Sequence, residues 1–159
     1  MSVLAIGQAA QNILATAIQS VASGTSVLLG HPDHFNDDII LYLYHLGYQP
    51  DIVKGAGNIR RPHEFAIHLM VRLSPDRVTT EATYLALHDA ITNAFYSSGE
   101  VRTLNGAAST SQLDPMSSGP NGTPYAATTE AGEYRQGWWK LTAQDTWTFD
   151  WRFAGGVPQ

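Results

Sequence analysis

The six histidines are the side chains of this 159-residue sequence with the most versatile chemistry, because imidazole transfers protons and binds metals near neutral pH. His31 and His34 lie three residues apart with Asp33 between them, and three such side chains can in principle bind a metal ion. Pro32, however, makes this segment a turn, and an HxxH spacing often occurs by chance. We therefore predict no metal site here.

The remaining histidines show no catalytic spacing. His88 and Asp89 are neighbours on a predicted helix, where consecutive side chains point about 100° apart, so we expect no acid–base dyad between them. No carboxylate is paired at an informative spacing with the other three, which are His45, His63 and His68. The chain also has no cysteine, no GxSxG motif, and no complete phosphate-binding motif around Gly55 and Gly57. We predict that the protein is not an enzyme and needs no cofactor.

Charged residues are few and unevenly placed. There are 14 Asp and Glu residues against 9 Lys and Arg, and this net charge of −5 argues against a general nucleic-acid-binding surface. The only dense positive cluster contains Lys54, Arg60 and Arg61. The Asp, Glu, Lys and Arg residues that precede this cluster are all acidic: Asp33, Asp37, Asp38 and Asp51. We predict that these residues form a protein interface, and the alternative for the basic cluster is solvated charge on a loop.

The first 24 residues are apolar enough to suggest a signal peptide or a membrane span, but they fit neither. The first cationic side chain is Lys54, and amides and hydroxyls interrupt the apolar run. We expect a soluble, intracellularly made protein without a membrane partner. Apolar side chains recur at steps of three and four over residues 4–22, which predicts a helix. Its opposite face has no charge, which fits either an ordinary surface helix or a helix packed against another subunit.

Apolar runs predict strands at residues 25–29, 39–46, 64–73, 100–104 and 147–153. A helix beginning at Asn36 is the alternative for the second run, but its short length and its isoleucines and tyrosines favour a strand. A second helix is predicted over 80–97, a polar connection over 47–62, and a long flexible loop over 105–132. Core packing is predicted for the aromatic C-terminus, at Trp147, Phe149 and Trp151. Together these elements predict a single α+β domain in which two helices pack on a mostly antiparallel β-sheet.

A family resemblance rests on residues 38–88. This part contains the strings DIILYLYHL at 38–46, RP at 61–62, FAIHLMVRL at 65–73, TE at 80–81 and LALH at 85–88. In these strings the chain resembles the terminator, or cap, proteins of contractile injection systems and phage tails. The order of its elements over residues 4–104 is similar as well, whereas 105–132 matches no pattern of the family.

The resemblance implies a subunit that assembles as a ring, usually a hexamer, on the last ring of a tail tube. Such a ring stops polymerisation of the tube and sheath and joins the tail to the neck or head. The implied partners are other copies of the chain, the tail tube protein, and sheath and neck or connector proteins, with no specific nucleic acid. The implied location is the virion tail or neck, or an injection-system particle, assembled in the host cytoplasm.

Two other interpretations stay open on the sequence. The first is a head–tail connector or another tail structural protein of the same broad fold. The second is a small-ligand-binding or hydrolytic α+β domain that uses His31, His34 and the aromatic C-terminus.

Overall fold

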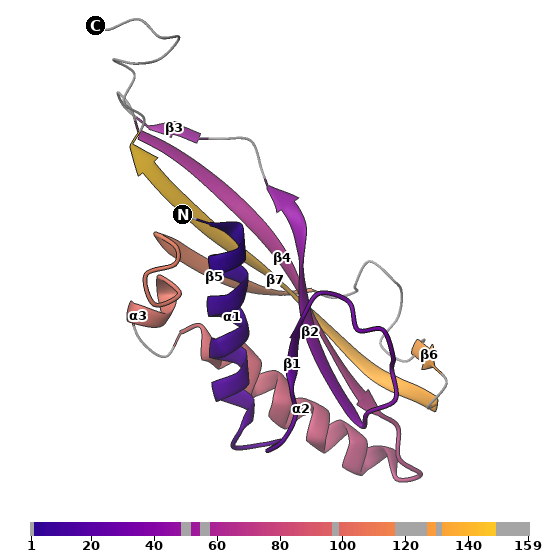
Figure 1. Cartoon of the computed structure of the whole chain (residues 1–159). Helices are drawn as coiled ribbons and strands as arrows, with labels where there is room; N and C mark the ends of the chain where they lie inside the picture. Colours follow the sequence, from indigo (N-terminus) through magenta and orange to yellow (C-terminus); the bar gives the residue numbers. More distant parts are fainter. Residues whose placement is uncertain are drawn as a thin grey trace, which may run out of the picture.

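The computed structural model describes residues 2–48, 52–54, 58–96, 99–116, 127–129 and 132–148. In chain order its elements are α1 (Val3–Ile18), β1 (Val27–Leu29), β2 (Ile39–Tyr48), β3 (Ile52–Lys54), β4 (Asn58–Arg72), α2 (Arg77–Ala94), α3 (Gly99–Arg102), β5 (Thr110–Met116), β6 (Ala127–Thr129) and β7 (Gly132–Thr148) (Figure 1). Within this part of the chain, no helix is long and apolar enough to cross a membrane.

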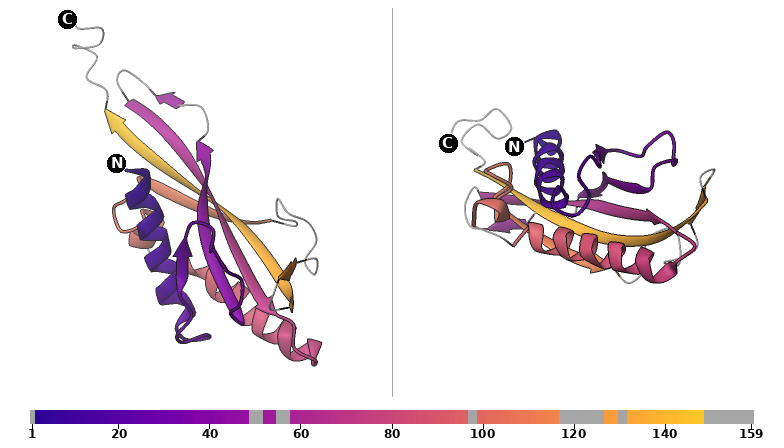
Figure 2. Two further views of the ribbon diagram at one scale, coloured as in Figure 1. Left: turned by 45° about the vertical axis from the view of Figure 1, so that its right-hand side comes forward. Right: turned by 90° about the horizontal axis from the view of Figure 1, so that it is seen from below.

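The described strands form one mostly antiparallel sheet. Its main order is β1-β2-β4-β7-β5, while β3 pairs with β4 and β6 pairs with β7. Only the β1–β2 pair is parallel among the described pairs. The longest ladder joins β4 to β7, from the Asn58–Thr148 pair to the Arg72–Tyr134 pair. Figure 2 shows the strong twist of these two long strands from two further sides. The predicted α+β class is confirmed.

The main core lies between the helices and one face of the sheet, because each helix has one apolar side and the central strands alternate. Helix α1 buries Ile6, Leu14 and Ile18, and α2 buries Leu87 and Ile91. The sheet contributes Leu41, Leu43, Phe65, Ile67, Leu69, Val71, Trp139 and Leu141. A smaller cluster lies on the opposite face and contains Ile40, Tyr42, Met70 and Tyr134, with Phe35 and Tyr44 packed against it. Both faces of β2 and β4 are therefore covered.

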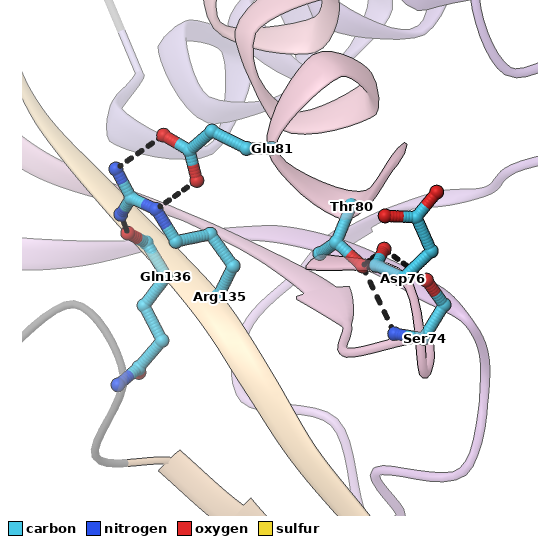
Figure 3. Close-up of polar contacts among 6 residues, drawn as sticks. All are labelled: Ser74, Asp76, Thr80, Glu81, Arg135 and Gln136. Atoms are coloured by element: carbon cyan, nitrogen blue, oxygen red, sulfur yellow. Dashed lines mark hydrogen bonds and ion pairs between the residues drawn. The ribbon is translucent and has the colours of Figure 1, made fainter. Parts of the chain in front are cut away.

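Helix α2 begins at a well-formed cap and is tied to β7. The Asp76 carboxylate accepts hydrogen bonds from the backbone N–H of Val78 and the hydroxyl of Thr79, which satisfies one N–H that the helix itself leaves unpaired. Arg135 of β7 forms an ion pair with Glu81, at 3.0 Å between Nε and Oε2 (Figure 3). These contacts fix the angle at which α2 crosses the sheet.

Three sequence predictions need correction. The connection predicted over 47–62 contains the end of β2, strand β3 and the first residues of β4, because β3 pairs with β4 and β4 pairs with β7, which supplies backbone hydrogen bonds to this polar stretch. The strand predicted over 100–104 is instead helix α3, where Glu100 in the first turn and Arg102 in the last suit the helix dipole. The predicted loop over 105–132 contains strands β5 and β6, and Leu113 of β5 is buried in the main core.

The long C-terminal strand is β7, which begins at Gly132 and includes Trp147. Trp138 and Trp139 are buried within it. Phe149 and Trp151 lie outside the described residues, and the core packing predicted for Trp147, Phe149 and Trp151 stays a prediction.

Candidate functional site

The predicted basic interface residues lie at one end of the sheet. Lys54 is the last residue of β3, and Arg60 and Arg61 lie near the start of β4. The Arg61 guanidinium lies over the ring of Tyr48, 5.4 Å from its centroid. We call Lys54, Arg60 and Arg61 the basic end. Figure 1 shows that β3 and the adjacent ends of β4 and β7 project beyond the start of α1.

The predicted acidic residues lie near the other end of β4. Asp33, Asp37 and Asp38 are exposed in the segment that joins β1 to β2, and we call them the acidic end. Asp38 forms an ion pair with Arg72, at 2.9 Å, although its own side chain remains 82% exposed. The Tyr134 hydroxyl donates a hydrogen bond of 2.6 Å to the backbone carbonyl of Asp37. These contacts hold the acidic segment against the sheet, whereas the fourth predicted residue, Asp51, lies outside the described residues.

Strand β4 separates the two ends. Arg61 and Arg72 both belong to this strand, and at about 3.3 Å per residue their backbones are roughly 36 Å apart. Sequence reasoning found the two sets of charges but placed the basic one in a flexible connection. The structure places the backbones of the three basic-end residues on paired strands, at the opposite end of β4 from the acidic end.

Both edges of the main sheet are partly blocked by side chains. At the β1 edge, the Gln11 amide donates a hydrogen bond of 2.7 Å to the Val27 carbonyl. At the β5 edge, the Tyr96 hydroxyl donates a hydrogen bond of 2.8 Å to the Leu113 carbonyl, and Pro115 has no backbone N–H to offer. Such edges are poor templates for a strand of another chain.

Helix α1 contains no charged residue. A groove of about 460 Å³ lies between α1, α2 and α3. Every residue that lines it is uncharged, and those with polar side chains are Asn12, Thr16, Ser20, Asn93 and Asn105. The cores of protein interfaces are likewise depleted of charged residues. The structure leaves both interpretations of this helix open, the ordinary surface helix and the helix packed on another subunit.

A buried polar network lies on the opposite face of the sheet, and sequence reasoning missed it. The Tyr42 hydroxyl lies 2.5 Å from Nδ1 of His68, and Nε2 of His68 lies 2.8 Å from the Gln136 amide oxygen. Because an amide oxygen only accepts, Nε2 carries the proton and Nδ1 accepts from Tyr42. Burial lowers the pKa of His68 to about 4 and raises the pKa of Tyr42 to about 12. Both groups are neutral near pH 7 and fully hydrogen-bonded, which is the pattern of a structural network.

The histidines considered for chemistry lie apart. The His31 ring packs on Tyr44, with ring centroids 4.4 Å apart, and His34 is exposed. Within the described residues, no three His, Asp or Glu side chains converge as metal ligands. Nδ1 of His88 and Oδ1 of Asp89, for which no acid–base dyad is predicted, lie 3.6 Å apart. That distance exceeds a normal hydrogen bond, so the contact is weak.

Comparison with known proteins gives no family assignment: no protein-family model matches the chain, and no curated protein matches it significantly.

Proposed function

We propose that this protein is the subunit of a ring that caps the end of a tail tube, in a phage tail or a related contractile injection system. The ring would stop polymerisation of the tube, and of the sheath where one exists, and join the tail to the neck or head. The resemblance over residues 38–88 suggests this function. The observation that carries it is the placement of opposite charges at the two ends of β4.

A closed ring needs this kind of asymmetry. In a ring, each subunit presents two different surfaces, one to each neighbour, and the two must be complementary. The acidic end, with Asp33, Asp37 and Asp38, is exposed, and the basic end lies roughly 36 Å away along β4. Opposite charges at such surfaces select the correct neighbour and speed association. A two-fold dimer can also pair each acidic end with a basic end, so the number of copies in the assembly distinguishes a ring from a dimer.

The uncharged outer side of α1 supports the same proposal. A ring on a tube has two further contacts, with the tube below and with the neck above. The groove of about 460 Å³ beside α1 is lined entirely by uncharged residues. This surface suits a permanent contact better than a solvated one. We assign it to the axial contacts of the ring.

The test measures assembly and end-capping. Mass photometry of the purified chain should show about six copies of the 17.3-kDa subunit, or about 104 kDa. Electron microscopy with purified tail tubes should show rings at one tube end and arrested elongation. The variant R60E/R61E should lose both properties, whereas R60K/R61K, which keeps the charge, should retain them. A chain that stays monomeric and binds no tube end overturns the proposal, and binding to the neck complex alone identifies a connector instead.

A further inference from the structure

Helix α2 has an apolar stripe on its outer side. Val78 is 79% exposed and Leu85 is 50% exposed, although the helix buries a separate stripe against the sheet. The two residues are seven apart, so they lie on one side of the helix and about 10 Å apart along its axis. Ala82, between them, is exposed as well. Surface helices usually place charged or polar residues on this side.

An apolar groove lies near the other end of the molecule. It measures about 240 Å³ and is lined by Val3, Leu4, Gly7, Leu29, Tyr44 and Phe65, among others. Leu4, at its rim, is 60% exposed. The groove is much larger than the roughly 30 Å³ that a water molecule occupies in the liquid, so it has room for a side chain.

The groove and the stripe have opposite charges beside them. His45 lines the groove and contacts His63. The His63 and Tyr48 ring centroids are 6.1 Å apart, and the Arg61 guanidinium lies over the Tyr48 ring. The groove is therefore next to the basic end. Helix α2 starts five residues after Arg72, which forms the ion pair with Asp38. Exposed Asp76 caps this start, so the stripe is beside the acidic end despite the positive charge of Arg77.

We infer that the α2 stripe of one copy docks into the α1–β1 groove of the next copy, which makes this the ring contact between subunits. Val78 and Leu85 enter the groove beside Leu4, and the acidic end of one copy faces the basic end of its neighbour. This inference rests on the proposed ring. The blocked sheet edges at Val27 and Leu113 argue against the alternative of strand pairing between copies.

Cysteine cross-linking tests this contact, because the chain contains no cysteine of its own. The double variant L4C/L85C, treated with a short bis-maleimide, should give a ladder of covalent oligomers up to the size of the full ring. The single variants L4C and L85C should each give less than a tenth of that product, because neither residue lies near the same residue of a neighbouring copy. The control T16C/L85C keeps one site and moves the other to an exposed position twelve residues along α1; it should give no ladder.

The outcomes separate this contact from the proposed function. A ladder from L4C/L85C alone supports the contact. Intact rings without that ladder, or with an equal ladder from T16C/L85C, show that the subunits meet elsewhere while the ring proposal survives. A monomeric chain that binds no tube end overturns both. As a second measurement, L85E should abolish rings while the Tm of the monomer stays unchanged, because Leu85 is half exposed. Normal rings in L85E would also overturn the contact.

Discussion

Gly137 of β7 lies against the side chain of Tyr84 of α2, where there is no room for a Cβ atom. A Cβ atom at this position would lie 2.3 Å from the Tyr84 hydroxyl oxygen, 2.9 Å from Cε2 and 3.0 Å from Cζ. Tyr84 cannot retreat easily, because it is buried and the Arg135 guanidinium lies 3.8 Å from its ring centroid. Arg135 is itself held by Glu81 (Figure 3). The substitution G137A must therefore displace the side chains of Tyr84, Arg135 and Glu81 together.

The expected cost follows from two opposing terms. Overpacking a well-filled site costs about 1–3 kcal/mol, and replacing a strand glycine by alanine recovers roughly 0.5–1 kcal/mol of backbone entropy. Because the clash at 2.3 Å is severe, the overpacking cost is about 2–3 kcal/mol, and the net loss in the free energy of unfolding is about 1–2.5 kcal/mol. This loss lowers Tm by roughly 2–10 °C for a chain of this size.

Thermal and urea unfolding followed by circular dichroism measure this loss. The double variant G137A/Y84F lacks the hydroxyl oxygen that would lie 2.3 Å from the added Cβ. The loss of stability from Y84F to G137A/Y84F should therefore be at most half of the loss from the unchanged chain to G137A. A Tm of G137A equal to or above that of the unchanged chain would refute the reasoning.

Three further predictions concern titration, capping and assembly. Because the pKa of folded His68 is about 4, below its ordinary 6.5, the unfolded chain binds more protons than the folded chain between these pH values. The free energy of unfolding should therefore fall by up to about 3 kcal/mol from pH 6.5 to pH 4. In H68N, the free energy from urea unfolding should lack this dependence on pH. The variant D76A should lower Tm because Val78 and Thr79 lose their acceptor, while D76N should retain most of the cap; equal Tm values for the two variants would contradict this. R60E/R61E should weaken assembly most at low salt, where screening is least, and should leave the Tm of the monomer nearly unchanged; salt-independent assembly in mass photometry would exclude the charged contact.

Strand β4 and the two long helices could be predicted because their apolar residues repeat with a clear period, and β2 because its apolar run is short and rich in isoleucine and tyrosine. The runs predicted at 39–46 and 64–73 became β2 and β4. The helix alternative beginning at Asn36 is wrong. Residues on both faces of these strands are buried, which explains why β2 reads as a continuous apolar run.

The outer strand segments could not be predicted, because their stability comes from a partner strand and not from their own side chains. Pro62 is buried in β4 opposite Gln144 of β7, although a proline among polar residues suggests a turn. In β5, Leu113 is the one residue that is fully buried among Thr110–Met116. A single buried side chain leaves no alternation that sequence reasoning can detect.

Part of the candidate interface could be predicted from the sequence. The two charge clusters stand out in the sequence, but only the β4 ladder shows that they lie at opposite ends of the subunit. The apolar part of the inferred contact, on α2, also has a pattern in the sequence. The period that predicts the buried stripe of α2 through Tyr84, Leu87 and Ile91 excludes Leu85 from that stripe, and Val78 also lies outside it. Large apolar residues outside the buried stripe of a helix mark a second apolar surface, and this is the surface that the inferred contact between copies would bury.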